Sequence, residues 1–213
     1  MIVEVSKRIA EKVSEELNYD NEKKEVIQYG TYALIQTLLS IISVLILGLI
    51  FGVAVDALVF LFTASILRKY SGGAHSESPN TCTALGIIMS LGVGLILKAK
   101  FFLNLDFLII VISTIIVFVF AYFVIYKYAP VDSPNKPIKT EKKKKRMRKG
   151  SFKILTIYLS IIIIGSILFY NFNLITVKPV IISILLGTLW QCITLLKVGH
   201  VLLKTIDSFA NKL

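Results

Sequence analysis

Charged residues are scarce in this chain. They make up 17% of its 213 residues, whereas hydrophobic residues make up 55% and the mean hydropathy is +0.77. Soluble domains contain about 25% charged residues, because their surface must be largely polar. The composition therefore excludes a soluble globular domain and indicates a membrane protein.

A cleavable signal peptide is also lacking. Residues 1–28 carry charges throughout and contain no apolar core followed by a small-residue cleavage site. We therefore expect the first membrane span to act as the insertion signal.

Cysteine and histidine each occur only twice. Cys82 and Cys192 lie at or near the ends of apolar runs, and two cysteines do not make a disulfide framework. A zinc site needs four ligands, of which a pair such as His75 and Cys82 supplies two. We expect neither a disulfide nor a metal, and no other cofactor is indicated.

Six apolar runs predict an all-α, polytopic membrane protein with a single membrane domain, residues 1–213. A helix needs about 20 apolar residues to cross the hydrocarbon core. Four runs reach this length, whereas the second and third have about 15 residues each, or roughly 22 Å of helix. These two short spans flank the polar stretch 68–82, which we expect in a protein-lined pocket or where the bilayer thins. The runs cover residues 31–50 and 53–67 (spans 1–2, 31–67), 83–97 and 107–125 (spans 3–4, 83–125), and 152–170 and 176–196 (spans 5–6, 152–196).

The distribution of cations predicts the orientation. Six spans put both termini on one side of the membrane, and 21 of the 24 Lys and Arg residues lie on that side. Cation-rich loops stay in the cytoplasm. We therefore expect both termini, the stretch 68–82 and the loop 126–151 to be cytoplasmic in a bacterial cell membrane. No aromatic-basic platform accompanies the charge, which argues against a nucleic acid partner.

The two terminal segments have helical amphipathic patterns. Residues 1–28 are predicted to form an amphipathic helix that lies on the membrane surface, contacts a partner or packs on the bundle. The tail 197–213 resumes such a pattern. The apolar stripe of the first segment consists of Val5, Ile9, Val13 and Leu17.

The loop 126–151 has two unlike parts. Residues 128–137 contain three prolines and are expected to be irregular and stiff. Residues 142–149 form a basic tract, for which we expect a role in topology and in contact with anionic lipid. Docking of an acidic peptide is the alternative.

The polar stretch contains the residues of a cysteine nucleophile. Cysteine reacts as the thiolate, and a nearby histidine can take its proton. His75 and Cys82 provide this pair. Either Ser78 with Pro79 or Asn80 is expected to start the third span, because serine and asparagine cap helices and proline suits the first helical position. Cys82 is therefore expected in the first turn, where the helix dipole favours a thiolate and free amides can hold an oxyanion.

Three further residues in the stretch have expected roles. Gly72 and Gly73 give the backbone the freedom to fold His75 back toward Cys82. Arg68 either binds a substrate carboxylate or braces the loop by donating hydrogen bonds to its carbonyls.

Other interpretations of the same residues stay open. A histidine and a cysteine seven residues apart also occur as a satisfied loop histidine and a small buried thiol. A non-enzymatic transporter, channel or assembly component fits six spans, although Asp56 and Asp106 lie near span ends rather than inside spans. A membrane acyltransferase would use Cys82 on a lipid, but no lipid headgroup site is marked. Cys192 is interpreted as a packing residue.

Two motifs occur in order: Arg68, Gly72, Gly73, Ala74, His75 and Cys82, and then the proline segment 128–137. Together with the length, the apolar runs and the basic tract, they resemble the accessory gene regulator B family. The resemblance implies a bacterial membrane cysteine endopeptidase that matures a quorum-sensing peptide. It makes His75 the general base and Cys82 the nucleophile, and Arg68 and Gly73 match positions that the family needs for activity.

The resemblance also implies the course of the reaction. The precursor peptide is cut to leave an acyl thioester on Cys82, and a cysteine or serine of the peptide then closes a thiolactone or lactone ring. Glu77, Asn80 and Asp132 are candidates for orienting His75 as the third member of a triad, with Asp132 preferred. The expected partners are the precursor peptide, membrane lipid and a second copy in a homodimer.

Overall fold

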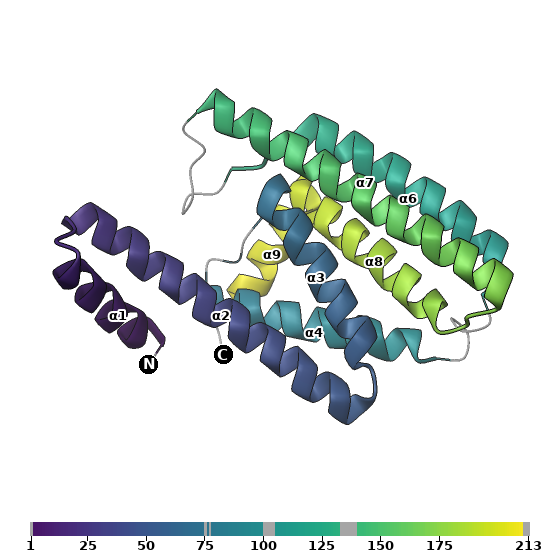
Figure 1. Cartoon of the computed structure of the whole chain (residues 1–213), viewed down its shortest axis with the longest axis horizontal. Helices are drawn as coiled ribbons and strands as arrows, with labels where there is room; N and C mark the ends of the chain where they lie inside the picture. The colour runs from purple at the N-terminus through teal and green to yellow at the C-terminus, as the bar shows by residue number, and fades with distance from the viewer. Residues whose placement is uncertain (1, 75, 77, 100–104, 133–139, 211–213) are drawn as a thin grey trace.

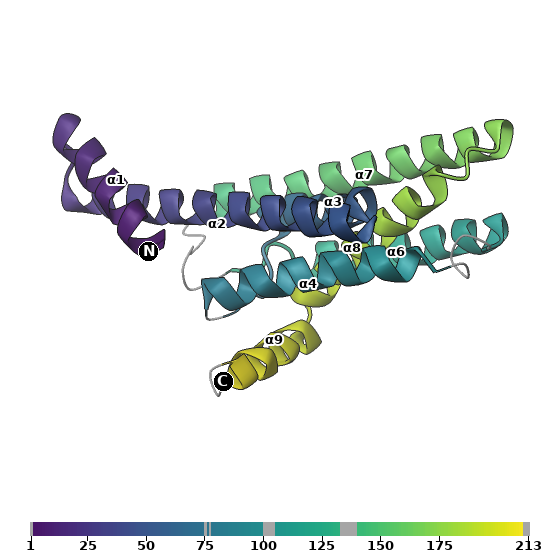
Figure 2. The same cartoon turned by 90° about the horizontal axis from the view of Figure 1, so that it is seen from below.

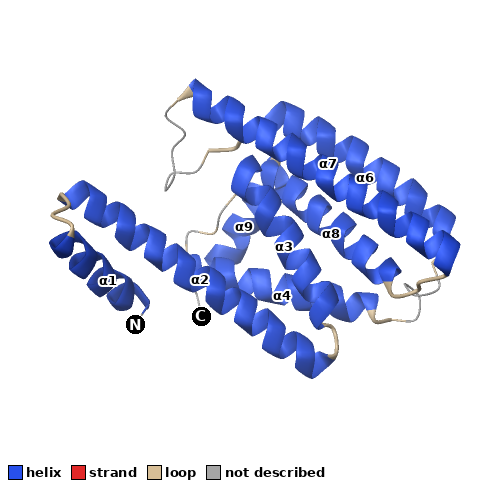
Figure 3. Ribbon diagram, in the orientation of Figure 1, coloured by secondary structure: helices blue, strands red, loops and turns tan. Residues whose placement is uncertain are grey.

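The computed structural model describes residues 2–74, 76, 78–99, 105–132 and 140–210. Every regular element in these ranges is a helix (Figures 1 and 3), so the all-α prediction is confirmed. The helices are α1 (Ile2–Glu16), α2 (Asn21–Phe51), α3 (Ala54–Ser71), α4 (Pro79–Leu97), α6 (Phe107–Tyr128), α7 (Glu141–Phe172), α8 (Val177–Leu195) and α9 (Lys197–Ala210).

Helix α8 lies at the centre of the bundle. It packs against α3, α4, α6 and α7, and more of it is buried than of any other candidate span. Helices α2, α3 and α7 form one layer and α4 and α6 the other, with α8 between them and α9 outside (Figure 2). The end of α3, the end of α8 and the segment after α6 meet at one end of the bundle (Figure 1). The polar stretch lies at that end.

Five helices in the described ranges are long and apolar enough to cross a membrane: α2, α4, α6, α7 and α8. The expected second span lies in α3, whose 18 residues include Asp56, Arg68 and Lys69, so a total of six spans stays a prediction. Helices α3 and α4 have 18 and 19 residues, or about 27 and 28 Å. They exceed the apolar runs because the polar turns beside those runs are also helical. Residues 68–71 and 79–82 of the stretch are therefore helical, whereas the described residues 72–74, 76 and 78 are not.

The N-terminal segment differs from the prediction of one helix over 1–28. Helix α1 ends at Glu16, and α2 begins at Asn21 and continues through the first apolar run. The break has a local cause, because the Asp20 carboxylate caps α2 by accepting the Lys23 N–H (2.9 Å). Helix α1 turns back along α2 (Figure 2).

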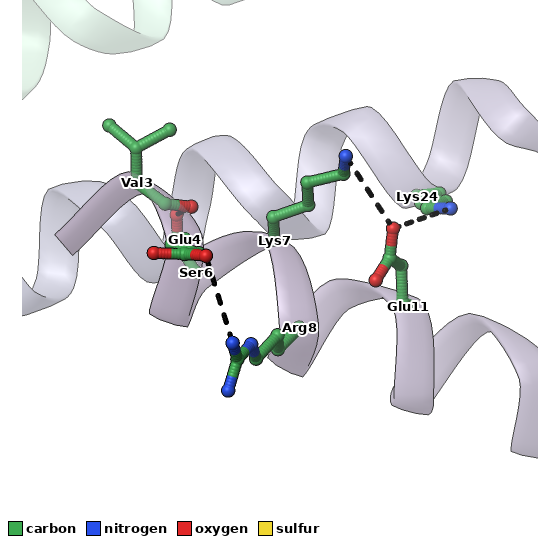
Figure 4. A network of polar contacts seen from close by, with 7 residues as sticks. All are labelled: Val3, Glu4, Ser6, Lys7, Arg8, Glu11 and Lys24. Carbon is green, nitrogen blue, oxygen red and sulfur yellow. Dashed lines mark hydrogen bonds and ion pairs between the residues drawn. The ribbon is translucent and has the colours of Figure 1, made fainter. Parts of the chain in front are cut away.

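Small side chains hold α1 against α2. Ser6, Ala10 and Ser14 are buried, whereas Val5 and Ile9 of the apolar stripe are 43% and 41% exposed. One surface ion pair, between Glu11 and Lys24, joins α1 to α2, whereas the pairs Lys7–Glu11 and Glu4–Arg8 lie within α1 (Figure 4). Because the stripe is not packed on the bundle, its place at a membrane surface or partner stays a prediction.

The basic tract is helical and not part of a loop. Helix α7 begins at Glu141, where the Thr140 hydroxyl accepts the Lys143 N–H (3.3 Å), and continues for 32 residues through the fifth apolar run. Lysine and arginine are good helix formers, so the polar tract extends the span without a break. Because α6 also extends to Tyr128, helices cover both ends of the predicted loop 126–151.

Candidate active site

Cys82 lies where the capping pattern placed it. The Ser78 hydroxyl caps α4 by accepting the Thr81 N–H (3.5 Å), and Pro79 is the first helical residue. The Cys82 N–H donates to the Ser78 carbonyl (3.0 Å). Cys82 is therefore in the first turn of α4, and its thiol is only partly buried.

The glycine pair ends α3 with a sharp change of direction. The Gly72 N–H donates to the Arg68 carbonyl (2.9 Å). Gly72 and Gly73 have φ values of +67° and +136°, which glycine adopts at little energetic cost and other residues rarely adopt. The chain thereby leaves α3 toward the end of α8.

Helix α8 holds this turn through one polar side chain and one backbone carbonyl. The Gln191 Nε2 donates to the Ser71 Oγ (2.9 Å) and to the Gly72 carbonyl (2.7 Å). The Ala74 N–H donates to the Thr194 carbonyl (2.9 Å). A Cβ on Gly73 would lie 2.7 Å from the Thr194 Oγ1. Gly73 is therefore needed for close packing as well as for its backbone conformation.

The segment after α6 folds back onto the same turn. The Val131 N–H donates to the Ser71 carbonyl (2.9 Å), and Gly72 and Val131 form an isolated parallel bridge. A Cβ on Gly72 would overlap the Val131 carbonyl oxygen. From α7, the Arg148 Nε donates to the Ala129 carbonyl (2.7 Å). Residues 129–131 thus support the turn in addition to α8.

Arg68 connects the turn to the cysteine. Its guanidinium donates to the Ala74 carbonyl, which is the bracing arrangement of the two expected for it. Its charge also interacts with that of a Cys82 thiolate. Arg68 is partly buried, so this interaction is less screened by solvent than one between exposed charges.

The structure places the remaining predicted residues as follows. Asn80 accepts a hydrogen bond from the Gln36 Nε2 of α2 (2.8 Å). Asp132 is exposed and directly follows Val131, whose N–H donates to the Ser71 carbonyl. His75 and Glu77 lie outside the described residues. Cys192 is fully buried in the apolar core, as expected for a packing residue.

Sequence reasoning missed the residues that hold the loop from other helices. Gln191 and Thr194 in α8 and Gln36 in α2 are polar residues in apolar spans. A polar residue inside a span is the sequence signal that could have identified them. Asp207 in α9 accepts a hydrogen bond from the Ser76 hydroxyl, and no sequence pattern indicated it. In the described ranges, no group of three or more His, Cys, Asp or Glu residues lies close enough to hold a metal ion.

Comparison with known proteins identifies the family of the chain. The family model of accessory gene regulator B matches residues 6–195. Two AgrB-like proteins of Clostridium perfringens, from strain 13 / Type A and strain SM101 / Type A, are 66% and 67% identical over 213 residues, all of this chain and of theirs. Another AgrB-like protein of strain 13 is 27% identical over 135 residues, 63% of this chain and 68% of its own. No solved structure matches. The chain is a multi-pass membrane protein that belongs to the accessory gene regulator B family, and this membership supports a role in processing the agr quorum-sensing peptide.

Proposed function

We propose that the protein is a membrane cysteine endopeptidase with Cys82 as nucleophile and His75 as general base, which cleaves and cyclises a quorum-sensing precursor peptide. The position of Cys82 carries the proposal: a partly exposed thiol in the first turn of α4, in electrostatic contact with Arg68. Helix N-termini and nearby cations stabilise thiolates.

The proposed reaction has two acyl transfers. His75 takes the proton of Cys82, and the thiolate attacks the carbonyl carbon of the scissile bond. The C–N bond breaks, the imidazolium gives its proton to the leaving amine, and the N-terminal part of the peptide stays on Cys82 as a thioester. A cysteine thiol or serine hydroxyl of this part then gives its proton to His75 and attacks the thioester carbonyl. The ring closes as a thiolactone or lactone, and Cys82 leaves as a thiolate that regains its proton.

The start of α4 also supplies donors for the oxyanion that each attack creates. Pro79 has no N–H, and the amides of Thr81 and Cys82 donate to Ser78. We assign the amide of Asn80, at the open end of the helix, to the oxyanion. The side chain of Asn80 is directed to Gln36, and of the other two candidates, Glu77 and Asp132, we keep Asp132 as our choice for orienting His75.

The same arrangement supports our proposals on orientation and partners. Residues 72–74, the segment 129–132 and the basic start of α7 lie at one end of the bundle, which we propose to be cytoplasmic. The exposed cations of 142–149 fit anionic lipid headgroups there. We retain the homodimer as the proposed assembly, which crosslinking in membranes tests.

Co-expression with the candidate precursor peptide tests the function. Mass spectrometry of the peptide would compare the wild type with Cys82→Ala and His75→Ala. Cys192→Ala is the matched control, because it removes the buried thiol outside the site. We expect the wild type and Cys192→Ala to cut the peptide, and the other two to be inactive while remaining in the membrane. Cleavage by Cys82→Ala at the wild-type rate would overturn the proposal and favour a non-enzymatic membrane component.

A further inference from the structure

The C-terminal helix α9 reaches the catalytic loop through a buried carboxylate. Asp207 is 5% exposed and is the only buried Asp or Glu in the described part of the chain. It accepts a hydrogen bond from the hydroxyl of Ser76, which is itself 8% exposed. A buried carboxylate is strongly unfavourable unless hydrogen bonds compensate its desolvation. A carboxylate at this place therefore indicates a specific role.

The contact falls in the middle of the loop. One end of the loop is fixed at Ala74, which bonds to Arg68 and Thr194. The other end is fixed at Ser78, the cap of α4. Ser76 lies midway between these two points. A hydrogen bond there restrains the loop at the residue that directly follows His75.

Helix α9 is itself held in place. It follows α8 after a single residue, and Gly199 packs so closely on Ile193 and Thr194 that a Cβ would lie 2.7 Å from the Thr194 Cα. The side chain of Leu203 is buried. Helix α9 also lies beyond residue 195, where the match to the family model ends. The contact is thus made by a segment outside the residues that the family model matches.

We propose that Asp207 is a positioning residue, which acts through Ser76 to hold the catalytic loop in the conformation that brings His75 to Cys82. The inference rests on the proposed cysteine endopeptidase function. It makes the C-terminal helix a part of the active-site architecture, because the loop is then fixed from α3, α8 and α9 together.

A double-mutant cycle in the full chain, reconstituted in lipid nanodiscs, tests the proposal. Ser76→Ala, Asp207→Asn and the double variant would be compared for kcat and KM on the precursor peptide. Each single variant is expected to lower kcat about tenfold or more, the loss that corresponds to one hydrogen bond to a charged group. KM should change little, and the double variant should be no slower than the slower single variant. Ser76→Thr keeps the hydroxyl and should restore much of the rate.

Two controls separate this inference from its alternatives. Asp106→Asn removes a carboxylate that caps α6 at the opposite end of the bundle and should leave kcat unchanged. The alkylation rate of Cys82, measured in a Cys192→Ala background, reports on the loop in the absence of substrate. This rate should fall in Ser76→Ala, so the inference can be tested even if Asp207→Asn does not fold. Wild-type kcat in both single variants, or effects that multiply in the double variant, would overturn the inference. Cleavage by Cys82→Ala would instead overturn the proposed function itself.

Discussion

Substitution of Gly72 by alanine is the sharpest test of how the loop is held. The added Cβ would overlap the carbonyl oxygen of Val131, a backbone atom that cannot rotate away. Gly72 also has φ +67° and ψ −151°, a region that non-glycine residues enter at about 1–3 kcal/mol. Separation of the two segments would break the hydrogen bond from Val131 to Ser71, whose net value is about 0.5–1.5 kcal/mol.

Together these terms disfavour the native loop conformation by roughly 2–4 kcal/mol, or about 30- to 700-fold in its population. We expect Gly72→Ala to lower cleavage of the precursor peptide at least tenfold. The matched control is Gly86→Ala in α4, where a Cβ meets no atom within 4 Å and alanine favours the helix. Both variants would be assayed at equal membrane abundance. Gly72→Ala with half the wild-type rate or more would refute the reasoning about the loop.

Three further substitutions test other supports of the site in the same cleavage assay. Gln191→Leu removes two buried hydrogen bonds to the glycine turn and should lower the rate about tenfold, at roughly 0.5–1.5 kcal/mol each; an unchanged rate would show that the turn does not need α8. Arg68→Lys keeps the charge but loses the planar donor that reaches the Ala74 carbonyl. The Arg68→Lys variant should therefore cleave the peptide more slowly than the control Lys69→Arg. Equal rates would contradict the bracing role of Arg68. Asp132→Asn should lower cleavage if this carboxylate orients the general base, and full activity at every pH would remove it from the mechanism.

Local chemistry explains which parts of the site were predictable. A serine cap followed by proline marks a helix start by itself, so the position of Cys82 in the first turn of α4 followed from neighbouring residues. The six apolar runs were each found within helices, because length and hydropathy are sufficient to identify such segments. The starts of α2 and α7 were not predicted: these helices begin at Asn21 and Glu141, whereas the apolar runs begin at residues 31 and 152. Helical hydrogen bonding continues past the point where hydropathy changes.

Contacts between distant segments explain what was missed. Gln191 lies 120 positions from Ser71 and Asp207 lies 131 positions from Ser76, and neither pair has a local sequence signal. Gly72 and Gly73 were expected to give the backbone the freedom to turn, and both have the positive φ values that glycine allows. The structure adds that a side chain has no room at either position. Close packing of the loop against α8 and the segment after α6 is the part that the sequence did not indicate.

The central claim is that Cys82 carries the acyl group, and trapping the intermediate tests it most directly. A precursor peptide whose internal cysteine or serine is replaced by alanine cannot cyclise, so the thioester should accumulate. Protease digestion and mass spectrometry of the enzyme would then locate the added mass. The account predicts a hydroxylamine-labile adduct, equal in mass to the N-terminal part of the peptide, on the fragment that contains Cys82. Cleavage of the peptide with no adduct on that fragment, or with the adduct on Cys192, would contradict it.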